Sequence, residues 1–364
     1  MNGKKILLVT PDFPPKEGGV ARYLKAVANH LQDRIEVLTD PNPLWNTFDP
    51  TAGYPIYRAP LLSTWMWPRW LKTVQYLWKY RARYDMILTS HVLPIGSAAW
   101  IAKMFTRVPY VVFVHGMDVR LAQSSARKLN LSRKVLNGAH LVVANSQALA
   151  REVAQIYGVK EVLVVYPCVN EIVAPVQEKT DVETFQLLTV SRLVERKGHA
   201  HVLNALAHLK GTGELRAFTY HIVGTGPMEE TLRSMVETLG IGEQVIFHGA
   251  VTDQERTTLY AQSDVFVEPV SKDPIDKEGF GLVFIEAGQQ GLPSISTSIE
   301  GVDEAVIHGE TGILLQNDSE QELANAILAL YRDTELRTAF SQQAREHAKQ
   351  FLCQTQMSKL DPYL

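Results

Sequence analysis

The sequence predicts an α/β protein of two domains, each with a parallel β-sheet covered by helices, and a cleft between them. Apolar, β-branched segments alternate with helical segments in both halves of the chain, which is typical of parallel sheets. The polar segment 171–183, with Pro175 and a cluster of charges, interrupts this alternation and indicates a linker. The length of 364 residues also fits two domains. We therefore expect domains at 1–172 and 173–340, and a C-terminal helix within 341–364 that packs back on the first domain.

The order of the elements follows from the periodicity of the apolar residues. A strand at 4–10 is followed by the turn Gly18-Gly19 and a helix at 20–32. Further strands of the first half are expected at 35–39, 86–90, 110–114, 141–144 and 162–166, with helices at 95–105 and 147–157. The second half predicts strands at 186–190, 220–223, 245–248, 265–267 and 294–297, and helices at 198–209, 228–239, 253–262, 282–290 and 319–332. Ligands of open parallel sheets bind beyond the carboxyl ends of strands, so residues that follow the strands are the candidates for a site.

The composition excludes several classes of protein. Hydrophobic residues make up 46% of the chain and the formal net charge is −3, which gives no reason to expect a nucleic-acid partner. No apolar run is long enough to span a membrane, and the first one is too short for a signal peptide. Cys168 and Cys353 are the only cysteines, so we expect neither a disulfide framework nor a Cys-rich metal site, and a reducing cytoplasm fits best. Without an Asp-x-Asp or His-x-x-x-His pair, no bound metal is expected.

Two glutamates flank a glycine loop at the start of the predicted helix 282–290. Gly279 and Gly281 leave the backbone accessible, and the first N–H groups of a helix have no partner within it, so a phosphate could bind there. We place Glu278 in the loop and Glu286 inside the helix, where sugar or ribose hydroxyls would donate to both carboxylates. The alternative is that Glu278 is a solvated loop charge and Glu286 pairs with a nearby base. The glycine loop favours a ligand site.

Cations follow the predicted strand 186–190. Arg192 and Lys197 suit a diphosphate, because an Arg guanidinium binds two oxygens and a Lys ammonium adds a point charge. A solvated basic loop is the alternative. The next strand ends in Gly224, where the sequence begins like a dinucleotide fingerprint, but Glu229 occupies the place of the third glycine. We therefore expect a tight turn there and no NAD site.

The first half offers two further candidates. His115 ends the strand 110–114 beside a glycine and is expected to point toward the cleft, although a hydrogen-bonded structural histidine fits equally well. His91 ends another strand and is a weaker candidate of the same kind. The turn Gly18-Gly19 could present backbone N–H groups to a phosphate, and a tight turn without a ligand is the alternative.

The segment 63–84 is rich in aromatic residues and cations and contains no acidic residue. It includes Trp65, Trp67, Trp70 and Trp78 among several Lys and Arg residues. Indole rings with neighbouring cations suit the interface of an anionic membrane. The alternative is an amphipathic helix whose aromatic face packs in the core. We expect peripheral membrane contact or a lipid-linked acceptor.

Taken together, these motifs resemble those of the retaining glycosyltransferases of family 4, which have the GT-B fold of two Rossmann-like domains. The resemblance covers most of the chain. It rests on Gly18-Gly19, His115-Gly116, 139–146, Ser191-Arg192 with Lys197, 223–227, 247–249, and the Glu-x7-Glu pair formed by Glu278 and Glu286.

The resemblance implies roles for single residues. The residues implied in catalysis are Glu278, His115, Arg192 and Lys197, and those implied in donor binding are Gly18, Gly19, Gly224, Gly249, Val251, Phe280, Gly281, Leu282, Val283 and Glu286. Glu278 and His115 would contact the donor sugar and Glu286 the ribose, while the cations would hold the diphosphate. Such enzymes generally work without a bound metal or another cofactor.

The segment Phe13-Pro14-Pro15 ahead of the glycine turn is similar to mannosyltransferases that act on lipid-linked or polysaccharide acceptors. The resemblance therefore implies transfer of a hexose from a nucleotide sugar, with GDP-mannose as the first expectation, in the cytoplasm or at the inner face of the membrane. A sugar-nucleotide epimerase of the same fold and a non-catalytic sugar-nucleotide-binding protein are the alternatives. The set of Arg192, Lys197, Glu278 and Glu286 favours transfer.

Overall fold

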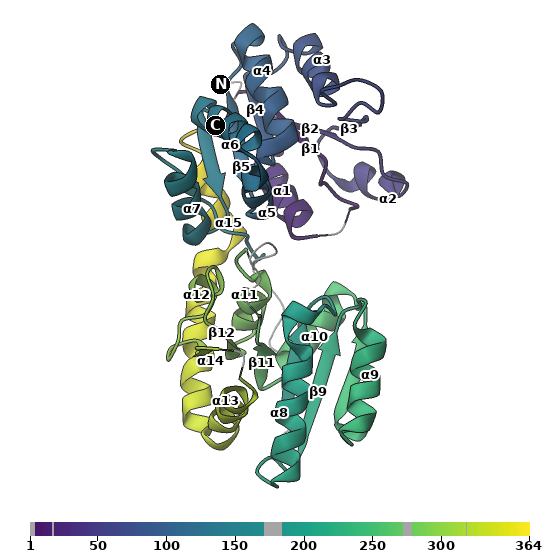
Figure 1. The fold of residues 1–364 in the computed structure, drawn as a ribbon, viewed down its shortest axis with the longest axis vertical. Helices are drawn as coiled ribbons and strands as arrows, with labels where there is room; N and C mark the ends of the chain where they lie inside the picture. The colour runs from purple at the N-terminus through teal and green to yellow at the C-terminus, as the bar shows by residue number, and fades with distance from the viewer. Residues whose placement is uncertain (1–3, 17, 171–183, 272–278, 318) are drawn as a thin grey trace. The chain divides into compact units, whose positions relative to one another are not determined.

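A computed structural model describes residues 4–16, 18–170, 184–271, 279–317 and 319–364. The chain forms two compact units, Met1–Cys168 with Cys353–Leu364, and Val169–Leu352. Each unit contains one parallel sheet covered by helices (Figure 1), which confirms the predicted fold class. The units are described separately below.

The sheet of the first unit has the strand order β3-β2-β1-β4-β5-β6-β7, with every pairing parallel. Its strands are β1 (Ile6–Thr10), β2 (Ile35–Thr39), β3 (Ile56–Arg58), β4 (Met86–Ser90), β5 (Tyr110–Val114), β6 (Leu141–Ala144) and β7 (Leu163–Val164). Its helices are α1 (Gly19–His30), α2 (Trp45–Phe48), α3 (Leu71–Lys79), α4 (Ser97–Thr106), α5 (Met117–Leu121), α6 (Ala126–Gly138), α7 (Gln147–Tyr157) and α15 (Cys353–Met357).

The central strands of this sheet are buried on both faces. All residues of β1, β4 and β5 are buried, which explains why these strands are largely apolar and show no polar alternation. Alternate residues of β1 enter two different cores. Ile6 and Leu8 pack with α1 and the C-terminal segment, and Leu7 and Val9 pack with α3, α4, α6 and α7.

The sheet of the second unit has the order β10-β9-β8-β11-β12-β13, again entirely parallel. Its strands are β8 (Phe185–Val190), β9 (Phe218–Val223), β10 (Val245–Gly249), β11 (Val265–Glu268), β12 (Ser294–Thr297) and β13 (Gly312–Leu315). Its helices are α8 (His199–Gly211), α9 (Glu229–Thr238), α10 (Asp253–Gln262), α11 (Leu282–Gln289), α12 (Val302–Ala305), α13 (Glu320–Arg332) and α14 (Thr334–Ala348).

The chain passes between the units a few residues from the predicted boundary. The first unit ends at Cys168, whereas the sequence suggested a boundary after residue 172. The segment predicted at 341–364 is divided, because the end of α14 belongs to the second unit and the first unit resumes at Cys353. The returning segment is anchored there by a contact of 2.7 Å between His30 Nε2 and Asp361 Oδ1, and by Met357, which enters the same core as α1.

The expectation of a chain without disulfides is corrected by the structure. Cys168 and Cys353 form a disulfide with Cα atoms 4.8 Å apart, although 185 residues separate them in the sequence. The bond joins the two points at which the chain leaves and re-enters the first unit. Such bonds are rare in the reducing compartments that the sequence suggested.

Candidate functional site

Each sheet has one point at which the strand order changes direction. In the first unit it lies between β1 and β4, and in the second between β8 and β11. Connections on the two sides of such a point leave toward opposite faces, which opens a crevice beyond the carboxyl ends of these strands. Of the residues predicted for the site, Gly18 and Gly19 follow β1 and Arg192 and Lys197 follow β8, whereas His115, Gly224 and Gly249 lie at the ends of other strands.

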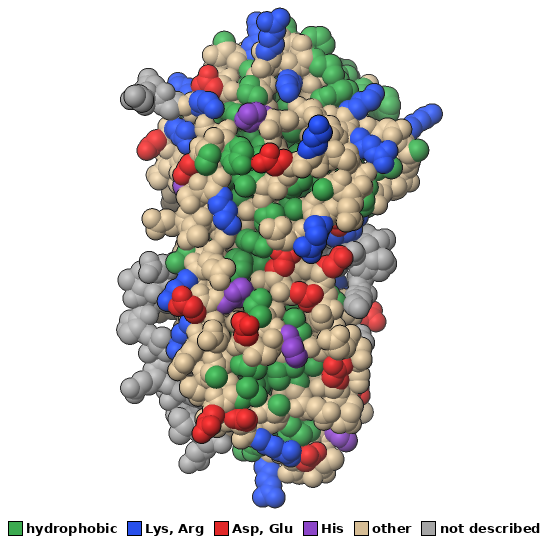
Figure 2. Space-filling model, turned by 90° about the vertical axis from the view of Figure 1, so that its left-hand side faces the viewer, with side chains coloured by type: hydrophobic (Ala, Val, Ile, Leu, Met, Phe, Trp, Pro, Cys, Tyr) green, Lys and Arg blue, Asp and Glu red, His purple; other side chains and the backbone are tan. Residues whose placement is uncertain are grey.

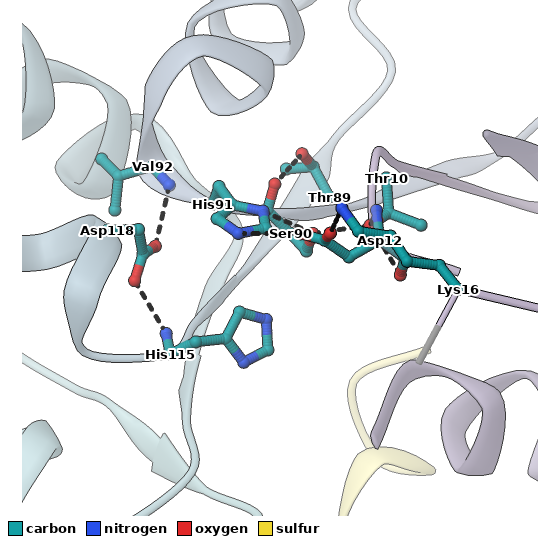
Figure 3. A network of polar contacts seen from close by, with 9 residues as sticks. All are labelled: Thr10, Asp12, Lys16, Thr89, Ser90, His91, Val92, His115 and Asp118. Atoms are coloured by element: carbon teal, nitrogen blue, oxygen red, sulfur yellow. Dashed lines mark hydrogen bonds and ion pairs between the residues drawn. The ribbon is translucent and has the colours of Figure 1, made fainter. Parts of the chain in front are cut away.

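A network of polar side chains covers the switch point of the first unit (Figure 3). Nε2 of His91 lies 3.2 Å from Oδ2 of Asp12, and the ammonium of Lys16 binds the other carboxylate oxygen. Nδ1 of His91 lies 2.9 Å from Oγ of Ser90, which in turn lies 2.8 Å from Oγ1 of Thr10. The backbone of His91 has a φ of 70°, which costs about 1–3 kcal/mol in a residue other than glycine. The surrounding contacts therefore hold Asp12 and His91 at the ends of β1 and β4.

His115 follows β5 and lies beside this network. Its backbone N–H donates to Oδ1 of Asp118 at 2.9 Å, and the other oxygen of Asp118 accepts from the N–H of Val92 at 3.0 Å. The ring contacts Tyr23 edge-on and lies 5.6 Å from the ring of His91. Burial lowers the pKa of His115 to about 4, so the ring is neutral near pH 7. Its Nε2 is buried and has no hydrogen-bond partner among the described residues, which leaves it available to a ligand.

The glycine turn after β1 has the expected form. Gly18 has a φ of 140°, which favours glycine, and α1 begins at Gly19 with 12 residues. Apart from the chain neighbours, no atom of the described residues lies within 4 Å of the position that a Cβ would occupy at either glycine. This open space at the helix N-terminus is consistent with a bound ligand and equally with a solvated turn.

In the second unit, the two predicted cations have different surroundings. Arg192 follows β8 and is exposed. Lys197, in contrast, is only 8% exposed, and its ammonium donates to Oε1 of Glu268 at 2.6 Å. Glu268 ends β11 and is completely buried, with 0% exposure. Glu268 was not among the predicted site residues; the signal for it was an acidic residue directly after the apolar strand predicted at 265–267.

The turns after β9 and β10 are tight. Gly224 has a φ of 128°, and a Cβ there would lie 1.9 Å from the carbonyl oxygen of Ser191. Its N–H donates to the carbonyl of Gly249, which ends β10 with a φ of 65°. Val251 then leads into α10, which starts with a capping box formed by Thr252 and Glu255. Close packing of backbone thus accounts for Gly224, as expected for a tight turn.

The helix α11 begins at a glycine, as predicted. Gly281 has a φ of 80° and precedes Leu282 and Val283, whose backbone N–H groups are in the first turn of the helix. The ring of Phe280 is buried, with its centroid 5.0 Å from that of Phe351. Only the backbone of Phe280 can therefore take part in the donor binding predicted for it.

Glu286 lies on α11 and is held by two residues of α10. Its Oε2 accepts a hydrogen bond from the hydroxyl of Tyr260 at 3.2 Å and lies 3.5 Å from Nε of Arg256. The contact with Arg256 is the pairing with a nearby base that the alternative interpretation expected, although Arg256 itself was not named. Tyr260 was not predicted, because nothing in the spacing relates α10 to α11. Glu278, the other member of the predicted pair, lies outside the described residues.

The segment 63–84 combines features of both alternatives. Only residues 71–79 are helical, as α3, and one face of α3 packs in the core. Trp65 and Trp67 on the preceding loop are 84% and 88% exposed. Trp78 lies against Phe105 of α4 at 6.2 Å, and the guanidinium of Arg81 stacks 4.3 Å above the ring of Trp78. An exposed aromatic surface with cations therefore extends over α3 and α4.

The two units differ strongly in charge. The first unit contains 22 Lys and Arg against 11 Asp and Glu, a net charge of +11. The second contains 14 against 28, a net charge of −14. On the face drawn in Figure 2, Lys and Arg side chains are widespread over the first unit. The small overall charge of −3 is the sum of these two opposite charges and therefore does not reveal the asymmetry.

Comparison with known proteins gives matches in both units. Residues 18–168 match the model of the glycosyl transferase 4-like domain, and residues 173–347 match that of the glycosyl transferases group 1. None of the helices described is long and apolar enough to cross a membrane.

Individual relatives match over most of their length. The GDP-mannose-dependent α-(1-6)-phosphatidylinositol monomannoside mannosyltransferase of Mycobacterium tuberculosis is 28% identical over 94% of this chain and 93% of its own. A D-inositol 3-phosphate glycosyltransferase of Corynebacterium glutamicum is 26% identical over 74% of this chain and 69% of its own. The crystal structure of HepE from Anabaena in complex with UDP-glucose superposes with a TM-score of 0.78 at 25% identity and covers 100% of both chains.

Proposed function

Because the chain belongs to the group 1 glycosyltransferases with a 4-like N-terminal domain, we propose that it transfers a hexose from a nucleotide sugar to a lipid-linked or polysaccharide acceptor, with retention of configuration. One observation carries this proposal. Arg192 and Lys197 follow β8, and α11 is the next described helix after β11, so the cations and the N-terminus of α11 belong to the switch point of the second sheet. A diphosphate bound there would meet the two cations and the N–H groups of the first helical turn.

Mannose from GDP-mannose is the proposed donor. The relative that matches over 94% of this chain is named for its use of GDP-mannose. HepE was crystallised with UDP-glucose, which makes UDP-glucose the second donor to test. The turn from Gly249 to Val251, which is proposed to line the base pocket, has no polar side chain that would distinguish the two bases.

The proposed mechanism uses this chain's residues for binding and for charge stabilisation. The bond between the anomeric carbon and the diphosphate oxygen breaks, and the acceptor hydroxyl oxygen bonds to the same face of that carbon. The hydroxyl proton passes to the departing phosphate, so the products are a glycoside and a nucleoside diphosphate. Arg192, Lys197 and the N–H groups of Leu282 and Val283 stabilise the charge that develops on the leaving group.

The remaining site residues position the donor. Glu286, held by Tyr260 and Arg256, accepts hydrogen bonds from the ribose hydroxyls. His115 is proposed to contact a sugar hydroxyl through Nε2, and its neutral ring and the missing partner of this atom among the described residues support that role. Glu278 is proposed to hold the sugar beside the reacting carbon. No metal is part of the proposal, since the cations and the helix N-terminus neutralise the diphosphate.

We further propose that the exposed aromatic surface of α3 and α4 binds an anionic membrane, at the inner face of which the acceptor is glycosylated. The net charge of +11 on the first unit supports attraction to anionic lipids, and Trp78 with Phe105 supports insertion at the interface. The core-packed face of α3 accounts for the rest of the helix.

A donor and acceptor screen tests the proposal. Release of GDP or UDP would be measured for GDP-mannose, UDP-glucose and UDP-N-acetylglucosamine, with and without vesicles that contain phosphatidylinositol mannosides. We expect acceptor-dependent release with the wild type and a large loss in Glu278→Gln and Lys197→Ala. Conversion of UDP-N-acetylglucosamine without an acceptor would instead identify an epimerase. Donor binding without turnover by any donor and acceptor would identify a binding protein.

A further inference from the structure

Lys197 and Glu268 meet at the switch point between β8 and β11. Lys197 ends the short 3₁₀ turn Glu195–Lys197, and Gly198 follows it with a φ of 72°. A Cβ at Gly198 would lie 2.2 Å from the carbonyl oxygen of Pro269, and the N–H of Ser271 donates to the carbonyl of Arg196 at 2.8 Å. The lysine turn and the end of β11 are therefore fixed against each other through their backbones.

The carboxylate of Glu268 is the more rigid member of the pair. It is fully buried, and its backbone carbonyl accepts two hydrogen bonds, from Oγ of Ser296 at 2.7 Å and from the N–H of Val270 at 2.9 Å. A lysine side chain has four rotatable bonds and takes its position from its partner. Burial of an ionised carboxylate away from water costs much free energy unless a cation and hydrogen bonds compensate the charge. The rigid carboxylate thus sets the position of the flexible ammonium.

We propose that Glu268 is a positioning residue for the leaving group, which holds the ammonium of Lys197 in the place where it meets the diphosphate. This inference rests on the proposed function, since it assigns Lys197 to the diphosphate. Glu268 does not touch the substrate in this account and acts through Lys197 alone.

Two other roles of Glu268 make different predictions. If the pair served only to hold β8 and β11 together, its loss would weaken the binding of every ligand of the unit to the same extent. If the carboxylate mainly opposed the phosphate charge, its removal would strengthen diphosphate binding. If Glu268 positions Lys197, loss of Glu268 should weaken the binding of the diphosphate but not that of the nucleoside, and it should do so only while Lys197 is present.

A double-mutant cycle separates these roles. The variants are Glu268→Leu, Lys197→Met and the double variant, in which an apolar pair of similar volume replaces the ion pair and preserves folding. Glu268→Asp is the conservative variant. Calorimetry would give the dissociation constants of GDP, UDP, guanosine and uridine, and thermal melting would verify that each variant is folded.

We expect Glu268→Leu to raise the dissociation constant of the diphosphate about tenfold or more, with less than a threefold change for the nucleoside. In the Lys197→Met background the same change should have less than a threefold effect, and Glu268→Asp should restore part of the affinity. Unchanged or tighter diphosphate binding in Glu268→Leu, or equal losses for diphosphate and nucleoside, would overturn the inference. If the wild type binds neither diphosphate, the proposed function itself fails, whereas loss in Lys197→Met without loss in Glu268→Leu refutes only the role of Glu268.

Discussion

Nδ1 of His221 lies 2.9 Å from Nε2 of His248, and the two rings are stacked with centroids 5.2 Å apart. His221 belongs to β9 and His248 to β10, and the far nitrogen of His221 contacts Oε1 of Gln186 on β8 at 2.8 Å. A hydrogen bond between the two imidazoles requires one nitrogen without a proton, so the pair cannot be fully protonated in this arrangement.

This pair predicts a stability that falls at mildly acidic pH. Burial, and then the neighbouring His248, lower the pKa of His221 to about 4, and burial lowers that of His248. Because the unfolded histidines bind protons at higher pH, their contribution to stability is present above about pH 6.5 and is lost as the pH falls toward 4. We expect the urea unfolding free energy to decrease by up to about 1.4 kcal/mol per pH unit for each such histidine. His221→Gln should reduce this slope, and the same change at the exposed His208 should leave it unaltered; an identical slope in both variants would refute the assignment.

Reduction of the disulfide between Cys168 and Cys353 should destabilise the protein. The bond joins two cysteines that are 185 residues apart in the sequence, and it ties the C-terminal segment to the first unit. We expect a reductant to lower the unfolding free energy by about 2–4 kcal/mol. The double variant Cys168→Ser with Cys353→Ser, which lacks the bond, should not respond to reductant. Rapid labelling of both thiols in protein kept from air and reductant would contradict the bond, and its detection in cells would argue against a reducing compartment.

The elements that the sequence predicted are those with strong periodicity. The buried strands β1, β4, β5 and β8 lie within a residue or two of their expected bounds, because short, largely apolar runs between turns leave little freedom in where a strand begins and ends. β3 was missed since it has three residues and no buried one, and α6 was missed because most of its residues are polar or charged. α6 depends on its cap, in which Oγ of Ser125 accepts from the N–H of Lys128.

The sequence predicted which residues lie near the ends of strands, but not which side chains contact one another. The ends of parallel strands can be placed from the alternation of elements, which located Lys197 and Glu286. Their partners Glu268 and Tyr260 come from other elements, 71 and 26 residues away in the chain. Which side chains of different elements meet depends on packing between them, and single-sequence spacing carries no information about it. The disulfide was missed for the same reason.

Tyr260 should contribute to ribose binding through Glu286. The variant Tyr260→Phe keeps the ring but removes the hydroxyl, so Oε2 of Glu286 loses one hydrogen-bond donor. We expect GDP to bind about fivefold more weakly, equivalent to about 1 kcal/mol for one hydrogen bond. Calorimetry with 2′,3′-dideoxy-GDP provides the control, because a ligand without ribose hydroxyls should bind the wild type and the variant alike. A fivefold loss for both ligands would indicate a general packing defect.

Trp78 and Phe105 should determine the affinity for anionic membranes. Their rings lie 6.2 Å apart on α3 and α4, both are exposed, and Arg81 covers the face of Trp78. Indoles and cations together favour the interface of an anionic bilayer, so we expect Trp78→Ser with Phe105→Ser to weaken sedimentation with phosphatidylglycerol vesicles about tenfold. The matched control is Trp45→Ser, which removes a similarly exposed indole from α2 of the same unit.

Because the net charge of +11 adds a salt-sensitive attraction, binding to the vesicles should also decrease as the salt concentration is raised from about 50 mM to about 500 mM. Absence of binding by the wild type at low salt, or equal losses in the α2 and α3–α4 variants, would refute this surface as the membrane contact.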